Sequence, residues 1–220
     1  TLTGKCWPAF QTQFGFVPCY VNSRLTAQGI PVSCEVDIYG ALSEYIGLCI
    51  SNDAVTLLDI NNSVPQYIYD EDIKGKYDYK LTDTFMGFHC GNTPACKMCD
   101  SRAVKYQLIQ HRLLEPAGSE PDFTRGTLEG DIAASDITFY RLQCNSEGEL
   151  VSYVAEGEVL DVPTRSFGGI GIFAIKEMGR FYRHVLIEGN YPHHGAVMFG
   201  HYGKAFYEVC LLYTSPSPRD

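Results

Sequence analysis

Residues 127–163 most narrowly limit the fold that this chain can adopt. The segment, TLEGDIAASDITFYRLQCNSEGELVSYVAEGEVLDVP, alternates short runs rich in β-branched and aromatic residues with turns of Gly, Asn and Ser. The later runs GIGIFAI and RHVLIEG continue the series. Many short, evenly spaced strands are typical of a β-barrel or sandwich. We therefore expect a β-barrel-like domain, followed by a terminal helix from about Gly200 to Val209.

The first fifty residues have a different sequence pattern, which predicts a strand followed by a helix. Residues 30–35, IPVSCE, predict a short buried strand, and Asp37 can cap the helix that follows it. The apolar residues of that helix fall on one stripe at helical spacing: Ile38, Ala41, Leu42, Tyr45, Ile46 and Cys49. A strand followed by a helix is half of a β-α-β unit, so the predicted fold class is α/β plus β. A change in composition near residue 51 marks the expected domain boundary, and AVTLLDINN (54–62) predicts the next strand.

Both ends of the sequence carry unusual signals. The chain starts at Thr1 with no initiator methionine, and we expect its N-terminus to be a cut end. Its last residues, LLYTSPSPRD, resemble the translated read-through of a sequencing adaptor, and their two Ser-Pro pairs end any helix. A natural Pro-rich tail is the alternative. Residues 210–220 are therefore set aside as a probable sequencing-adaptor artefact.

The charge of the chain excludes several kinds of partner. A net charge of −9 argues against a nucleic acid or an anionic membrane, because phosphates repel an acidic surface. No apolar run is as long as a membrane span. The nine cysteines are an odd number, and several lie in apolar segments, as free thiols of cytoplasmic proteins do. A cytoplasmic protein is expected, with a disulfide framework as the weaker reading.

Two acidic residues stand at the ends of, or inside, apolar strands. Glu35 ends the first predicted strand and Asp59 lies in the second, 24 residues later by subtraction (59 − 35). A buried carboxylate must be paired, hydrogen-bonded, protonated or bound to a metal. Glu35 and Asp59 could share one divalent cation while one of them acts as a general base. Alternatively, each caps a turn or pairs with an arginine.

Histidines at strand ends strengthen the metal hypothesis. His89 ends the apolar run FMGFH, and NYPHHGA places His193 and His194 beside a glycine. Adjacent residues on extended backbone point in opposite directions, so at most one of the pair is expected to face a given ion. Two carboxylates with two imidazoles favour Mn²⁺ over a closed tetrahedral zinc site.

A second metal site competes with this one. HCGNTPACKMC holds His89 with Cys90, Cys96 and Cys99, a spacing that could bind structural zinc. The segment lacks the second Cys-x-x-Cys or His-x-x-x-His that makes a zinc pattern specific. Separately, Trp7, Gln11 and Gln13 could line a substrate pocket, although the aromatic residues around them are equally suited to a core.

Five segments together resemble the L-fucose isomerase-like family of sugar isomerases, with L-arabinose isomerases as distant relatives. They are CWPAFQTQ, CEVDIYGALSEYIG, LLDINN, GFHCGNTP and PHHGAVMFGHYG. The resemblance implies an oligomer with two Rossmann-like α/β domains and a C-terminal β-barrel domain. It makes residues 1–50 the end of the second α/β domain and residues 51–209 the barrel domain.

The resemblance also implies roles for individual residues. Glu35 and Asp59 would bind the metal and act as the acid/base pair, His194 would be the third ligand, and His89 matches a further ligand of the arabinose isomerases. Asn190, Gln11 and Gln13 are the candidate substrate contacts. The implied activity is Mn²⁺-dependent aldose–ketose isomerisation of a sugar such as L-fucose or D-arabinose through an ene-diol, with the 220 residues inactive alone. A sugar-binding or regulatory protein without turnover, and a zinc-ribbon interaction module, are the alternatives.

Overall fold

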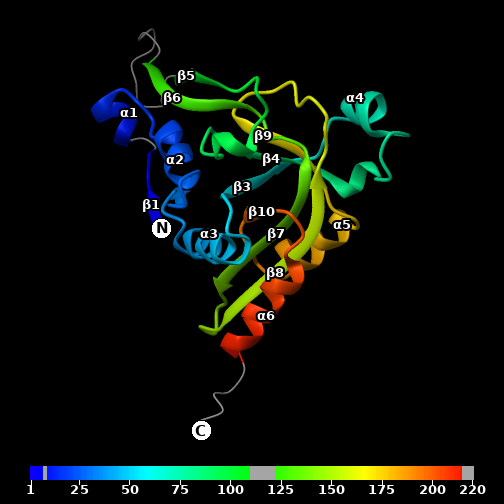
Figure 1. Ribbon diagram of the computed structural model, residues 1–220. Helices are drawn as coiled ribbons and strands as arrows, with labels where there is room; N and C mark the ends of the chain where they lie inside the picture. Colours follow the sequence, from blue (N-terminus) through cyan, green and yellow to red (C-terminus); the bar gives the residue numbers. More distant parts are fainter. Residues whose placement is uncertain (7–8, 110–121, 215–220) are drawn as a thin grey trace.

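The computed structural model describes residues 1–6, 9–109 and 122–214, and a closed barrel forms its centre (Figure 1). The neighbouring strands run β4-β3-β10-β7-β8-β9, and β9 pairs back with β4, so the ring closes. All six neighbouring pairs in this ring are antiparallel. The strands are β3 (Val55–Asn62), β4 (Thr84–His89), β7 (Ser135–Cys144), β8 (Leu150–Val159), β9 (Gly169–Ala174) and β10 (His194–Phe199). The barrel expected from the sequence is confirmed, but the run RHVLIEG, expected to continue the strands, is helical over Tyr182–Ile187.

A hairpin extends the sheet beyond the ring. Its strands are β5 (Ala103–Ile109) and β6 (Asp122–Asp131), which pair antiparallel with each other. The end of β6 joins β9 in parallel, with Gly130 opposite Gly169 and Asp131 opposite Ile170.

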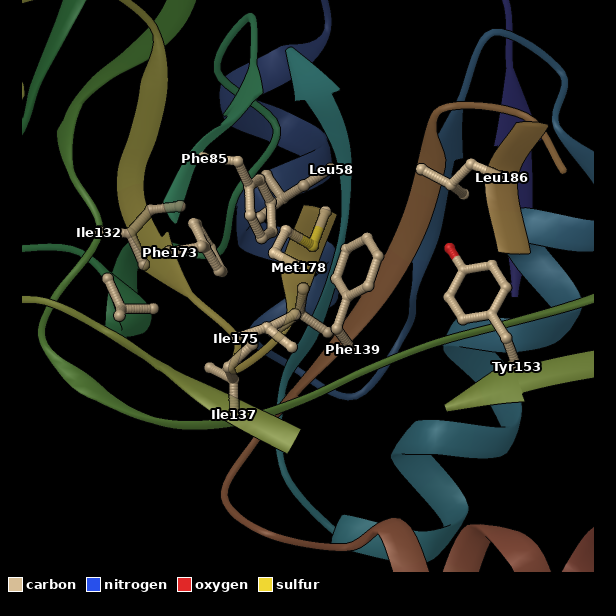
Figure 2. Close-up of a cluster of buried hydrophobic side chains, with 12 residues drawn as sticks. Leu58, Phe85, Ile132, Ile137, Phe139, Tyr153, Phe173, Ile175, Met178 and Leu186 are labelled. Atoms are coloured by element: carbon tan, nitrogen blue, oxygen red, sulfur yellow. The ribbon is translucent and has the colours of Figure 1, made fainter. Parts of the chain in front are cut away.

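Alternating side chains fill the interior of the ring. Figure 2 shows Phe85, Phe139 and Phe173 facing one another, and the rings of Phe85 and Phe173 are stacked with centroids 5.3 Å apart. The buried core residues of this cluster include members from all six strands: Leu58, Phe85, Ile137, Phe139, Tyr153, Val159, Phe173 and Val197. Because strand side chains alternate, the neighbours of these residues face outward and form two further clusters on the outside of the ring.

The N-terminal part covers one side of the barrel, and α4 lies on the opposite side in Figure 1. Its elements are β1 (Leu2–Gly4), α1 (Ala9–Phe14), α2 (Cys19–Thr26), β2 (Val32–Cys34) and α3 (Ile38–Ser51). Strands β1 and β2 pair in parallel, with Gly4 opposite Cys34. The predicted strand, helix and Asp37 cap are confirmed: the Asp37 carboxylate accepts a hydrogen bond from the Gly40 amide. That these residues end a Rossmann-like domain stays a prediction.

The face that α3 turns to the barrel is not the apolar stripe predicted from its periodicity. Ile38 is 67% exposed and Tyr45 is 51% exposed. The buried residues of α3 are Gly40, Ala41, Ser43, Glu44 and Gly47. They face Tyr140 and Leu142 of β7: the Tyr140 hydroxyl donates to the Ser43 carbonyl, and the Leu142 amide donates to the Ser43 hydroxyl. Small and polar residues pack here because β7 brings a large tyrosine and an amide that donates to the Ser43 hydroxyl against the helix.

The remaining helical segments connect or flank the strands. They are α4 (Gln66–Ile68), η1 (Tyr69–Ile73), η2 (Leu81–Asp83), η3 (Ala95–Lys97), α5 (Met178–Phe181), η4 (Tyr182–Ile187) and α6 (Gly203–Thr214). The terminal helix α6 packs Phe206 against Tyr140. Among the residues described, no helix has the length and apolar character needed to cross a membrane.

Candidate metal centre

Asp59 and His194 occupy opposing positions on two paired strands of the barrel. The register of β3 and β10 places Asp59 directly across from His194. Asp59 Oδ1 and His194 Nε2 lie 3.1 Å apart. Both side chains share the outer face of the ring with Leu57 and Ala196, because residues two apart on a strand point the same way. The strand pairing alone therefore brings one predicted carboxylate against one predicted imidazole.

Glu35 reaches the same place from outside the barrel. It follows β2 directly, and its Oε2 lies 3.5 Å from His194 Nε2. Glu35 and Val36 both have a φ of 61°. The left-handed region is unfavourable for non-glycine residues and especially for a β-branched valine, so the fold holds a strained turn here. The turn swings the carboxylate back toward β10, while the Val36 amide donates to the Gly4 carbonyl.

His193 joins the group although extended backbone would point it away. Its Nε2 lies 3.8 Å from Asp59 Oδ1, and ligand atoms of Asp59, His193 and His194 all lie within 4.8 Å of one another. The expectation that only one histidine of the pair faces the site is wrong, because His193 lies in a bend and β10 begins at His194. In the sequence, only Pro192 signals this bend.

His89 lies at the end of β4, beside Asp59. Its neighbour Phe88 is the β-ladder partner of Asp59, and His89 itself is 2% exposed. Burial lowers the pKa of His89, although the charges of Asp59 and Glu35 oppose the shift. The imidazole is therefore neutral, and its Nδ1 has no hydrogen-bond partner among the described residues.

Asp37 connects the site to the rest of the fold, a role that the sequence did not predict. Its carboxylate lies 2.9 Å from His194 Nδ1 and pairs with Arg141. Burial would raise the pKa of Asp37, but hydrogen bonds from His194 and Arg141 outweigh it and hold the pKa well below its ordinary value. In the sequence, the only indication of this role is the position of Asp37 two residues after Glu35, because its partner Arg141 is far away along the chain.

The charges of the site favour a cation. Burial raises the pKa of Asp59, but the adjacent His194 imidazole and the other nearby histidines lower it overall, so Asp59 is ionised. Burial lowers the pKa of His194, whereas its hydrogen bond to Asp37 and the adjacent Asp59 carboxylate raise it to about 9. In the metal-free protein His194 thus carries the proton that balances the carboxylates.

A divalent metal ion fits the donor atoms that are present. Asp59 Oδ1 and His194 Nε2 are buried and lack a partner with hydrogen-bond geometry in the described part of the chain, despite being 3.1 Å apart. Buried polar atoms are normally satisfied, so two such atoms facing each other are what an ion between them would explain. A mixture of carboxylate and imidazole donors suits Mn²⁺ and similar divalent cations.

In the described part of the chain, the other predicted residues are not part of this group. Asn190 is exposed, and its carbonyl accepts a hydrogen bond from Gln143. Gln13 is exposed on α1. Gln11 belongs to the same helix, but its side chain lies outside the described part of the structure, as does Trp7. The roles of Asn190, Gln11 and Gln13 in substrate binding stay predictions.

The competing zinc site does not assemble within the described residues. Cys90, Cys96 and Cys99 are absent from the one group of three or more metal-binding side chains found there. Cys96 is exposed, and the charged groups near Cys99 are Asp131, Asp161 and Asp100.

Two comparisons with known proteins both match this chain to sugar isomerases. Residues 87–216 match the family described as "L-fucose isomerase, C-terminal domain". The sulfoquinovose isomerase of Alkalicoccus urumqiensis is 26% identical over 96% of this chain and 42% of its own length. The sulfoquinovose isomerase of Priestia megaterium is 26% identical over 90% of this chain and 39% of its own length. The chain thus spans about two-fifths of the length of these relatives.

Proposed function

This chain belongs to the L-fucose isomerase C-terminal domain family, and on that premise we propose that it forms the metal-binding part of an aldose–ketose isomerase. The observation that carries the proposal is the convergence of Glu35, Asp59 and His194, which are distant in sequence, on one point of the barrel surface. A structural role alone does not require Asp59 Oδ1 and His194 Nε2 to face each other, buried and without hydrogen-bond geometry, with the Glu35 carboxylate beside them.

Glu35, Asp59 and His194 would hold a divalent cation, for which we propose Mn²⁺, with His89 and His193 beside them. When bound, such an ion acts as a Lewis acid that stabilises negative charge developing on neighbouring sugar oxygens. The mixed oxygen and nitrogen donors support this choice.

The two carboxylates divide the proton transfers of the reaction. In an aldose–ketose isomerisation, one of Glu35 and Asp59 takes the proton from C2 of the sugar, giving an ene-diol, and returns it to C1. The other carboxylate exchanges protons with the hydroxyl groups at O1 and O2. Strand pairing fixes the position of Asp59, whereas the side chain of Glu35 is largely exposed. A bound sugar would therefore contact one fixed carboxylate and one with more freedom to move.

The substrate is proposed as a free aldose. The family description favours L-fucose, with D-arabinose as its pentose counterpart, while the relatives are named for sulfoquinovose. The residues that line the sugar pocket determine which of these sugars is the substrate, because the metal site contacts only atoms that all aldoses share. The three sugars therefore form the panel to be tested.

Metal binding is tested first, on the 220-residue chain. Electron paramagnetic resonance follows the loss of free Mn²⁺ as protein is added, for the native chain and for Glu35→Gln, Asp59→Asn and His194→Gln. We expect one ion per chain, with binding lost in Asp59→Asn and His194→Gln. If native chain and Asp59→Asn bind Mn²⁺ equally, this metal centre is refuted.

Turnover is tested in a chimera, because the chain spans only part of its relatives. The matching segment of the Alkalicoccus urumqiensis enzyme is replaced by this chain, and ketose formation is measured for each sugar of the panel. We expect turnover that disappears with Glu35→Gln or Asp59→Asn. A chimera that binds Mn²⁺ and sugar without forming ketose would instead favour the sugar-binding protein without turnover.

A further inference from the structure

The Asp37 carboxylate bonds to three separate parts of the fold. Oδ1 accepts from the Gly40 amide at 2.7 Å and from Arg141 Nη2 at 2.9 Å. Oδ2 accepts from Arg141 Nη1 at 2.7 Å and lies 2.9 Å from His194 Nδ1. Oδ1 thus serves the start of α3, Oδ2 serves the histidine, and the guanidinium bridges the two oxygens.

This arrangement assigns different tasks to the two ring nitrogens of His194. A carboxylate oxygen only accepts hydrogen bonds, so Nδ1 must carry the proton that points to Asp37. Nε2, on the far side of the ring, faces Asp59 and Glu35. In a ring with one proton, fixing it on Nδ1 leaves the lone pair on Nε2, where a cation would be bound.

Arg141 fixes the orientation of Asp37. Its side chain is 5% exposed and grips the carboxylate with both Nη atoms, a geometry that allows the carboxylate plane little rotation. Nη1 also lies 3.3 Å from the His194 carbonyl oxygen, to which it donates. Arg141 therefore ties Asp37 to the backbone of the residue whose ring Asp37 orients.

We propose that Asp37 is a positioning residue that holds His194 with its Nε2 lone pair turned toward the divalent cation, and that Arg141 locks Asp37 in that position. The inference deepens the proposed function and rests on it, because it requires His194 to bind a metal. Helix capping alone would not need Asp37 to be charged, since asparagine caps a helix equally well.

The two oxygens of Asp37 make Asp37→Asn a selective test. The Gly40 amide requires an acceptor at the Oδ1 position, so the side-chain amide group of asparagine must take the Oδ2 position. That NH₂ donates toward His194 Nδ1, which then accepts and moves the ring proton to Nε2. The helix cap survives while the metal-binding atom is blocked.

We expect Asp37→Asn to weaken Mn²⁺ binding about tenfold to hundredfold, as loss of such outer partners typically does. The dissociation constant is measured by paramagnetic resonance on the 220-residue chain, with far-ultraviolet circular dichroism as the check of folding. Asp53→Asn is the matched control, because Asp53 lies just past the other end of α3, has an exposed side chain and pairs with Lys97. Its affinity should stay within about twofold of the native value.

A double variant covers the possibility that Asp37→Asn fails to fold with Arg141 left unpaired in the interior. Asp37→Asn/Arg141→Met removes the buried positive charge together with its partner, a replacement that proteins often tolerate. The double variant should show the same loss of Mn²⁺ affinity.

A spectroscopic signature separates positioning from a general structural effect. With diamagnetic Mg²⁺ in place of Mn²⁺, the native chain should show a downfield Nδ1 proton resonance of His194, identified by its absence in His194→Gln. The resonance should disappear in Asp37→Asn and persist in Asp53→Asn.

The outcomes distinguish the inference from the proposed function. A folded Asp37→Asn chain with native Mn²⁺ affinity, alongside an Asp59→Asn chain that no longer binds, overturns the positioning role and leaves the metal centre intact. A native chain that binds no Mn²⁺ overturns both.

Discussion

Asp59 and His194 are direct cross-strand partners, and this pairing of β3 with β10 sets the 3.1 Å separation of their facing atoms. Two of the three proposed ligands therefore belong to one antiparallel ladder of a closed barrel. The third, Glu35, comes from a strained turn after β2. The site combines a preformed pair with a residue delivered by a separate segment.

Metal binding should stabilise the folded chain. An ion that binds only the native state at about 100 times its dissociation constant adds about 2.7 kcal/mol to the free energy of unfolding. We expect urea unfolding monitored by circular dichroism to shift by this amount between EDTA and Mn²⁺. Asp59→Asn should abolish the shift, whereas Asp100→Asn, which changes a fully exposed side chain, should keep it. An equal shift in both variants would mean that Mn²⁺ acts elsewhere.

Glu44 should make stability fall as the pH rises. It is fully buried, and burial, followed by the negative charge of Asp37, raises its pKa from 4.5 to about 7 against the hydrogen bond from Ser33. Between these values the native chain binds more protons than the unfolded chain, so the free energy of unfolding decreases with pH, by up to about 1.4 kcal/mol per unit.

Replacing Glu44 by glutamine should remove that contribution. Relative to the native chain, Glu44→Gln should gain stability progressively between about pH 4.5 and 7, reaching roughly 3 kcal/mol above that window. Urea unfolding in EDTA at a series of pH values measures the difference. Glu208→Gln, on the exposed side of α6, is the control and should track the native chain. Parallel pH curves for native and Glu44→Gln chains would contradict the raised pKa.

Gly47 should not tolerate a side chain, although it lies inside a helix. A Cβ atom built there overlaps the hydroxyl of Tyr140, which is fully buried and donates to the Ser43 carbonyl. Gly47→Ala gains about 1 kcal/mol of helix propensity but overpacks the contact, so we expect a net loss of about 1–3 kcal/mol. Thermal and urea unfolding measure it. At Gly179 in α5 the nearest atom to such a Cβ is 3.8 Å away, so Gly179→Ala should be neutral or mildly stabilising.

Substitutions on the exposed apolar face of α3 should cost less stability than substitutions on its buried polar face. Ile38 is largely exposed, so Ile38→Ser should change the unfolding free energy of this chain by no more than about 0.5 kcal/mol. Ser43 is buried, and its hydroxyl donates to Tyr39 and accepts from Leu142. Ser43→Ala leaves a buried amide unpaired and should cost about 1–3 kcal/mol. A larger loss for Ile38→Ser than for Ser43→Ala would reverse the assigned orientation of the helix.

The sequence predicted the elements better than the contacts between them. The start of α3 at Asp37 and most of the alternating strands depend on local patterns and are present in the structure, whereas the run RHVLIEG, expected as a strand, is the helical segment η4. The buried face of α3 was not predictable from helical spacing, because it is determined by Tyr140 and Leu142, about a hundred residues later. Local periodicity reports where apolar residues lie on a helix, not which neighbour covers them.

The candidate site shows the same division. Glu35, Asp59 and His194 were predicted from carboxylates and histidines at strand ends together with a family resemblance, and the fold brings them together. The sequence did not predict the contact of Asp37 with Arg141 or that of His193 with Asp59. The first joins residues 104 positions apart, and the second depends on a bend just before β10.

Ring closure between β9 and β4 makes the two sides of the candidate metal centre mechanically unequal. Any sliding of β3 along β10 would have to be matched around the whole circuit, so the gap between Asp59 and His194 resists adjustment to ions of different radius. Glu35 lies outside that circuit, in the turn where it and Val36 both have left-handed backbone. Accommodation of a smaller or larger cation would therefore fall to this one carboxylate, whose movement would not disturb the strand pairing of the barrel.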